Sequence, residues 1–100
     1  MTGATEPSTT SVGSVTVRYW AAARAAAGVE CDVVPVEGGT TLADVLATVR
    51  SLHGDSDRFD GVVAVCSVLV GDRPVRSADP AEVRVSPGDS VELLPPFAGG

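Results

Sequence analysis

Lysine is absent from this chain of 100 residues, and all seven of its basic residues are arginines. The absence excludes a Schiff-base lysine and the lysine of a P-loop, and it leaves the N-terminus as the only primary amine. The net charge of −6 argues against a nucleic-acid partner, because the phosphates would be repelled. A partner with a basic face, or a solvated acidic surface, fits this charge better.

Long apolar runs are lacking too. No segment approaches the roughly 20 apolar residues that a membrane-spanning helix needs, and no basic-then-apolar leader indicates secretion. We therefore expect one cytoplasmic domain with no membrane contact. Cysteines stay reduced in that compartment, and we expect Cys31 and Cys66 to pack as small apolar residues in Val-rich strands. Two thiols are too few for a four-thiolate zinc or iron–sulfur site.

Catalytic constellations are also missing. His53 is the only histidine, and we interpret it as a helix-terminal residue, where a cation near the last carbonyls is favourable. Asp55, Asp57 and Asp60 lack the glycine and the terminal glutamate of a calcium loop. No GK[ST] follows Gly38-Gly39, which we interpret as a turn. We therefore predict no metal site, no permanently bound cofactor and no catalysis by this chain alone.

What the sequence contains is a series of strand patterns and one strong helix pattern. Residues 1–14 are polar and predict a disordered leader. The segments expected after it are a strand over 15–20, a helical turn over 21–28, a strand over 30–37, a helix over 42–53, a loop over 55–61, a central strand over 62–71, a short extended piece over 83–85, a turn over 86–89 and a last strand over 90–96.

The helix over 42–53 has the clearest signals. Thr41 and Asp44 form a capping-box arrangement with Asp in place of Glu, and Gly54 stands where a left-handed C′ residue belongs. We expect the helix to pack its apolar stripe against the sheet; the residues of this stripe are Leu42, Val45, Leu46, Val49 and Leu52. Pro35 places the strand over 30–37 at a sheet edge. Phe59 is expected to pack back as a plug.

This order predicts an α+β fold, in which one main helix packs across one face of a mixed sheet. Right-handed crossover places the first and last strands side by side, as parallel neighbours in the middle of the sheet. That is the β-grasp, or ubiquitin-like, roll. The domain would span 15–94, and a flexible C-terminal tail would follow over 95–100.

Alternation along the strands also assigns side chains to faces. Trp20, Leu69 and Leu94 fall on the sheet face that the helix leaves uncovered. A cluster of exposed apolar side chains on one face indicates a docking surface. The alternative is that the long loop after Gly71 folds over these residues and covers them.

The sequence closes on LLPPFAGG, residues 93–100. Pro95 and Pro96 cannot extend a central ladder, so they lead the chain out of the sheet in an extended course. Gly99 and Gly100 have no Cβ and can pass a slot too narrow for a side chain. Such a tail would bring the α-carboxylate of Gly100 into another protein's nucleotide site, where this poor electrophile can be activated.

Four segments together resemble the ubiquitin-like sulfur carriers of the MoaD/ThiS family, in particular the small subunits of molybdopterin synthase. They are YWAAARAAAG, TLADVLATVRSLHG, SPGDSVELLPP and the closing PPFAGG. The resemblance covers about residues 15–100. It implies an E1-like enzyme that uses ATP and magnesium to adenylate Gly100, and sulfur transfer that converts the adenylate to a thiocarboxylate.

The resemblance further implies a partner and site residues. The tail, formed by Pro95, Pro96, Phe97, Ala98 and Gly99, would insert into the large synthase subunit, which supplies the catalytic residues. Sulfur would pass to cyclic pyranopterin monophosphate, in an assembly of two carriers and two large subunits. Trp20, Leu69 and Leu94 match the family's apolar contact positions, and Arg24 matches an arginine that would contact the activating enzyme. Phe97 is bulkier than the small aliphatic residue expected after the prolines.

Three other interpretations stay open on the sequence. The carrier could serve thiamine or cysteine biosynthesis, where only the sulfur acceptor differs. The chain could instead be a ubiquitin-like modifier attached through Gly100 to lysines of other proteins. It could also be a plain β-grasp interaction module, because fold alone does not determine function.

Overall fold

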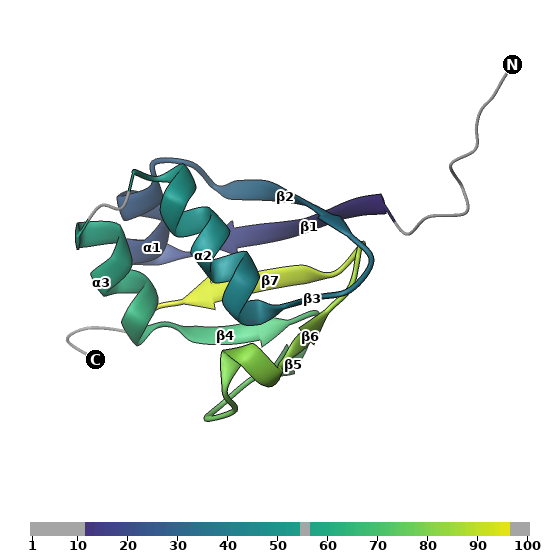
Figure 1. Cartoon of the computed structure of the whole chain (residues 1–100). Coiled ribbons are helices and arrows are strands. Elements are labelled where there is room, and N and C mark those ends of the chain that lie inside the picture. Colours follow the sequence, from purple (N-terminus) through teal and green to yellow (C-terminus); the bar gives the residue numbers. More distant parts are fainter. Residues whose placement is uncertain (1–11, 55–56, 97–100) are drawn as a thin grey trace, which may run out of the picture.

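A mixed five-stranded sheet with strand order β2-β1-β7-β4-β5 forms the frame of the molecule. The computed structural model describes residues 12–54 and 57–96 (Figure 1). The strands of this sheet are β1 (Val12–Tyr19), β2 (Cys31–Glu37), β4 (Ser67–Val70), β5 (Arg73–Pro74) and β7 (Ser90–Leu94). β1 and β7 are parallel, and the other pairs are antiparallel. The predicted parallel pairing of the first and last strands is confirmed.

Helices cover one face of this sheet. They are α1 (Ala21–Ala27), α2 (Leu42–Leu52) and α3 (Asp57–Val65), with a short 3-10 helix, η3 (Pro80–Glu82). α2 crosses the sheet, while α1 and α3 gather at the end where β1 and β7 finish (Figure 1). A separate two-stranded ladder joins β3 (Thr40–Thr41) to β6 (Arg84–Val85). The α+β β-grasp class is confirmed, although three helices, and not one, lie on the covered face.

The core lies between α2 and the middle of the sheet. Val15, Val17 and Tyr19 of β1 are buried, as alternation predicts, and so are Val91 and Leu93 of β7. Val17 pairs with Val91 and Tyr19 with Leu93, so the two strands present one apolar surface to the helix. Burial of these side chains stabilises the fold by about 25 cal/mol per Å² of apolar area removed from water.

The α2 helix begins and ends where the sequence predicts. The Thr41 hydroxyl accepts a hydrogen bond from the backbone N–H of Asp44 at 3.2 Å, which satisfies one free donor of the first turn. Gly54 follows with φ +72°, a left-handed conformation that favours glycine. Leu42, Val45, Leu46 and Val49 are buried, but Leu52 is 56% exposed, so its expected place in the core was wrong. Leu52 lies at the C-terminal end of α2, beyond the part that covers the core.

The segment 57–71 differs most from the prediction, which had a loop over 55–61 and a strand over 62–71. Residues 57–65 form α3, and the strand that was expected over 62–71 is limited to β4. Phe59 and Val63 are one helical turn apart and both buried, which favours a helix although three of the four residues 62–65 are β-branched valines. Asp57 and Asp60 lie in the first turn, where negative charge favours a helix. Phe59 is fully buried, as expected of a plug.

Two further differences concern the ends of strands and the cysteines. β1 begins at Val12, three residues before the expected start, and residues 1–11 lie outside the described residues. Cys31 is exposed on β2, so its predicted role as a packing residue was wrong. Cys66 packs partly against the core. Burial raises the pKa of the Cys66 thiol to about 11. Both are free thiols.

Over residues 12–54 and 57–96, no helix combines the length and the apolarity needed to cross a membrane.

Candidate docking face and tail exit

The end of β1 and the end of β7 lie side by side where the tail leaves the sheet. Tyr19 pairs with Leu93, and the Trp20 N–H donates to the Leu93 carbonyl at 3.2 Å. This register places Trp20 next to Leu94, the last residue of β7. β7 ends at Leu94, two residues before the end of the strand expected over 90–96, and Pro95 and Pro96 follow with no strand structure, as expected of two prolines that cannot extend a ladder. Phe97, Ala98, Gly99 and Gly100 lie outside the described residues.

Trp20 is held on the face of the sheet opposite the helices. Its side chain is 43% exposed, and its indole N–H donates to the Glu92 carboxylate at 3.0 Å. The Arg18 guanidinium lies 5.8 Å from the ring centroid, within the range of a cation–π contact. Two contacts thus orient a large exposed aromatic side chain. Ala21, the next residue, has φ +49°, a strained conformation for a residue with a Cβ.

The three apolar residues predicted for this face share it. Glu92 pairs with Leu69 and Ser67 pairs with Leu94, so Leu69 lies diagonally across from Leu94 on the outer side of the sheet. Leu69 and Leu94 are half-buried, and Trp20 is exposed. We call this set, with Arg18 and Glu92, the outer face.

The segment after Gly71 does not cover the outer face. Val75 donates its N–H to the Val68 carbonyl at 2.9 Å, and Ala78 and Pro80 line a hollow together with Leu42 and Leu46 of α2. This segment therefore packs beside the helix. A second hollow, of about 290 Å³, adjoins Leu69 at its border with Pro74 and Arg76. The outer face stays open, and a partner's side chain could enter the hollow.

Arg24 lies at the same end of the molecule as the tail exit (Figure 1). It stands on α1, one turn after Trp20, and its guanidinium forms an ion pair with Glu30 at 3.2 Å. Both side chains are more than half exposed, so the pair contributes little to stability. Arg24 remains accessible to a protein that handles the tail.

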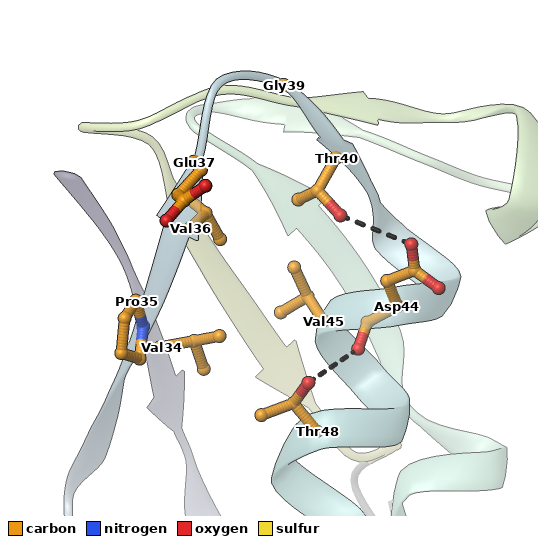
Figure 2. Close-up of a pocket in the computed structure, with 9 residues that line it drawn as sticks. All are labelled: Val34, Pro35, Val36, Glu37, Gly39, Thr40, Asp44, Val45 and Thr48. Atoms are coloured by element: carbon orange, nitrogen blue, oxygen red, sulfur yellow. Dashed lines mark hydrogen bonds between the residues drawn. The ribbon is translucent and has the colours of Figure 1, made fainter. Parts of the chain in front are cut away.

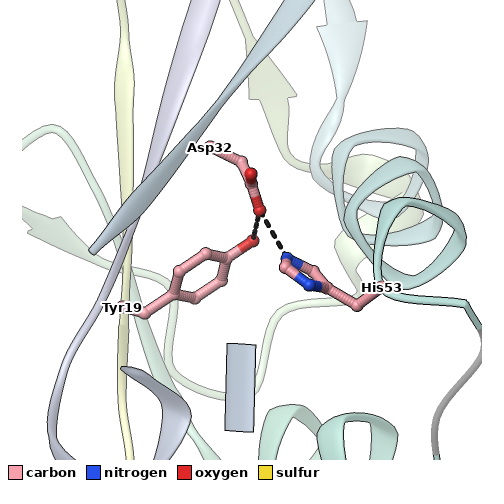
Figure 3. A network of polar contacts seen from close by, with 3 residues as sticks. All are labelled: Tyr19, Asp32 and His53. Carbon is pink, nitrogen blue, oxygen red and sulfur yellow. Dashed lines mark hydrogen bonds and ion pairs between the residues drawn. The ribbon is translucent and has the colours of Figure 1, made fainter. Parts of the chain in front are cut away.

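Sequence reasoning missed a polar network behind the outer face. The Tyr19 hydroxyl donates to Asp32 Oδ2 at 2.6 Å, and His53 Nε2 lies 2.6 Å from the same oxygen (Figure 3). His53 also lies against Phe59, with ring centroids 4.5 Å apart. Burial, and then the bond to Asp32, raise the pKa of Tyr19 above its usual range. One signal for this network was in the sequence, because Asp32 alternates with the inward-facing Val34 and Val36.

The network joins three elements that the sequence separates. His53 caps α2, Asp32 lies on β2, and Tyr19 ends β1 directly before Trp20. A carboxylate that bridges a histidine and a tyrosine also occurs in catalytic sites, but here the side chains of His53 and Asp32 are only 15% and 20% exposed. We interpret the network as a structural clamp, which fixes the end of β1 beneath Trp20.

Removing the tyrosine hydroxyl tests this clamp. Tyr19→Phe keeps the ring in the core but loses the bond to Asp32, so we expect a loss of about 1 kcal/mol in unfolding free energy near neutral pH. The pKa of Tyr19 is higher in the folded chain, so the unfolded chain releases the phenolic proton first and stability falls above about pH 10. That fall should be smaller in Tyr19→Phe.

Urea unfolding near neutral pH and above about pH 10 measures both effects. The Cys66→Ala protein is compared with the Tyr19→Phe/Cys66→Ala double variant. Cys66 is removed from both because its thiol also has a raised pKa, so its ionisation would lower stability at high pH as well. Parallel losses of stability with pH in the two proteins would contradict the clamp.

Comparisons with known proteins identify the family. The ThiS family model matches residues 17–100, which include the end of β1, all of β7 and the closing Gly99-Gly100. The chain belongs to the ThiS family. A molybdopterin synthase sulfur carrier subunit from Chlamydomonas reinhardtii is 29% identical over 86 residues, which cover 86% of this chain and 98% of that protein.

Solved structures share the fold of this ThiS-family chain. SAMP1, a small archaeal modifier protein from Haloferax volcanii, is 26% identical with a TM-score of 0.66, over 88% of this chain and 100% of that chain. In a complex of subunits 1 and 2 of the molybdopterin-converting factor from Helicobacter pylori, one chain has a TM-score of 0.60 at 21% identity. The match covers 87% of the present chain and 99% of the other.

Within the described residues of this ThiS-family protein, no group of three or more His, Cys, Asp and Glu side chains is placed to hold a metal ion. The Tyr19–Asp32–His53 network is a cluster of titratable side chains that the structure adds to the sequence prediction. The predicted site residues therefore divide into Trp20, Leu69 and Leu94 on the outer face, Arg24 on α1, and a tail that begins at Pro95.

Proposed function

We propose that this chain is a sulfur carrier of molybdenum cofactor biosynthesis, with the carboxylate of Gly100 as its reactive group. The family match that runs through β7 to Gly99-Gly100 is the observation that carries this proposal. The similarity to the Chlamydomonas sulfur carrier subunit supports the assignment to molybdopterin synthase. Catalytic residues would come from the large subunit.

The chemistry begins with activation of the carboxylate. In the active site of an E1-like enzyme, with ATP and magnesium, the Gly100 carboxylate would attack the α-phosphate of ATP and release pyrophosphate. A sulfur nucleophile would then displace AMP and leave a thiocarboxylate. The end of β7 at Leu94, next to Trp20 and directly before Pro95 and Pro96, supports the proposal that the following residues would form the arm for this step.

The charged carrier would then bind the large synthase subunit through the outer face. Trp20, Leu69 and Leu94 form an apolar group around Glu92, and all lie near the point where the tail begins. Docking there would insert residues 95–100 into the large subunit, which transfers sulfur to cyclic pyranopterin monophosphate. The Helicobacter structure is a complex of two subunits, which supports a partner of this kind.

Reconstitution tests the pathway. The thiocarboxylated chain is mixed with a molybdopterin synthase large subunit and cyclic pyranopterin monophosphate, and molybdopterin formation is followed. The uncharged chain is the control. We expect product only with the charged chain, in proportion to the thiocarboxylate consumed. If the charged chain loses its sulfur only to a partner from thiamine or cysteine biosynthesis, the protein belongs to that pathway instead.

A second candidate function is that of a protein modifier. The similarity to SAMP1 at 26% identity favours it. A modifier would join Gly100 to lysines of other proteins and give a ladder of covalent adducts on denaturing gels. Because this chain has no lysine, it cannot extend such adducts through lysine-linked chains of itself. Each target lysine would therefore carry a single copy of this chain. A sulfur carrier, in contrast, would give no stable adducts on the gel.

A further inference from the structure

The outer edge of β2 carries backbone groups that no other strand uses within the described residues. β2 is the first strand of the sheet and pairs only with β1. The Tyr19 N–H donates to the Glu30 carbonyl at 2.9 Å, which fixes the phase of the antiparallel ladder. By alternation, the residues whose backbone groups point away from β1 are Cys31, Val33, Pro35 and Glu37. Such an edge can accept an added strand.

A groove runs beside this edge, between β2 and α2 (Figure 2). Its volume is about 180 Å³. Val34 and Val45, which are almost completely buried, form its apolar floor, and Thr48 lies on the α2 side. A strand added to β2 would direct alternate side chains toward α2. The groove is in the place where small apolar side chains of such a strand would lie.

The charges beside the groove are mainly negative. Glu37 lies on the β2 side and Asp44 on the α2 side (Figure 2). Glu37 forms no ion pair with the described residues, and the Asp44 carboxylate accepts only a 3.3 Å bond from the Thr40 hydroxyl. The Arg84 guanidinium lies close to Gly39, at the turn that closes one end of the groove. Basic side chains that alternate with the apolar ones would lie on the exposed face of an added strand, where the Glu37 carboxylate would complement them.

A second copy of this chain is a poor occupant. Pairing β2 with β2 would bring together two chains of net charge −6, and each would present its own Glu37. Pro35 removes one donor from the edge, which further limits pairing of this edge with itself. Cys31, Val33 and Glu37 keep their N–H groups for a different strand.

We propose that this edge and groove bind an extended, basic segment of a partner protein as an added β-strand. Its backbone pairs with Cys31, Val33 and Glu37, and its apolar side chains enter the groove. The lysines or arginines that alternate with them lie on the opposite, exposed face of the added strand, beside Glu37. β1 separates this edge from β7, so the segment binds without using the outer face or the tail. The carrier thereby holds a partner while Gly100 stays free to react.

Nuclear magnetic resonance titration of the ¹⁵N-labelled full chain tests the proposal. The probe is a short peptide of alternating valine and lysine, and the control peptide has glutamate in place of lysine. We expect the basic peptide to shift the signals of residues 31–37 and 40–48 and to slow amide exchange at Val33 and Glu37. The acidic peptide should leave these signals unchanged.

Matched variants separate strand addition from general attraction between charges. Val33→Pro removes an outward N–H from an exposed position, and Val33→Ala keeps it; we expect the proline to weaken peptide binding about tenfold relative to the alanine. Glu37→Gln should weaken binding several-fold, while Glu82→Gln on η3 should not. Unchanged signals from core amides show that each variant is folded.

Three results would overturn the proposal. The first is equal affinity of the Val33→Pro and Val33→Ala variants. The second is a set of shifts scattered over acidic residues away from β2 and α2. The third is movement of the β2 signals with protein concentration alone, which would make a second copy the occupant. None of these results depends on the chemistry of Gly100, so they leave the proposed function untouched.

Discussion

Gly100→Val is expected to abolish charging of the carrier while the fold stays intact. A valine side chain cannot follow a backbone that passes a slot shaped for glycine, and the carboxylate then stops short of the activating enzyme's ATP. A displacement of this size lowers the rate of adenylation by about a hundredfold or more. The measurement is pyrophosphate release by the E1-like enzyme, with thermal unfolding as the test of fold.

Gly61→Val is the matched control for this change. It adds the same side chain to an exposed glycine of α3, where no atom lies within 4 Å of an added Cβ. We expect this variant to be charged at the wild-type rate. Normal charging of Gly100→Val would show that the closing glycine is not selected for a narrow passage.

Trp20→Ala is expected to produce the second large effect, a loss of affinity for the large synthase subunit. Trp20 is the largest side chain of the outer face, and a central tryptophan commonly contributes about 2 kcal/mol or more to an interface. That corresponds to roughly a thirtyfold weaker Kd. The Tyr19–Asp32–His53 clamp remains in place, so unfolding free energy should change little.

Calorimetric titration of the large subunit measures this loss. Leu52→Ala is the control, because Leu52 is 56% exposed on α2, on the helix side of the sheet. Its affinity should equal that of the wild type. Equal losses in the two variants would mean that the outer face is not the docking surface.

Local signals were sufficient for most of the fold. Alternation in β1 and β7, the Thr41 cap and the left-handed Gly54 each describe a short stretch of chain that folds as its own residues favour. The face of Leu69 was also predictable, although the strand around it is shorter than expected. The phase of alternation depends only on the residues of β4 themselves.

α3 could not be predicted because its sequence favours two structures. Val62, Val63 and Val65 are β-branched and typical of strands. Packing decides in favour of the helix, since Phe59 is buried against Tyr19 and His53 only when residues 57–65 are helical. The contact between Tyr19 and Phe59 joins residues that are 40 positions apart in the sequence. No local pattern contains them.

The same reason explains why the site was predicted only in part. Trp20 and Leu94 become neighbours through the parallel pairing of β1 and β7, which topology rules predict. Asp32 and His53 are 21 residues apart and meet only because α2 lies across β2. The groove beside β2 depends on that packing as well, so sequence alone indicated a sheet edge at Pro35 but no binding surface.

The most direct test of a reactive Gly100 is the mass of the intact chain after incubation with ATP, an E1-like activating enzyme and a sulfur source. The account predicts that one oxygen is replaced by one sulfur, and that a C-terminal fragment containing Gly99 and Gly100 carries the whole change. An unchanged mass, or sulfur found only on a fragment that contains Cys31 or Cys66, would contradict it.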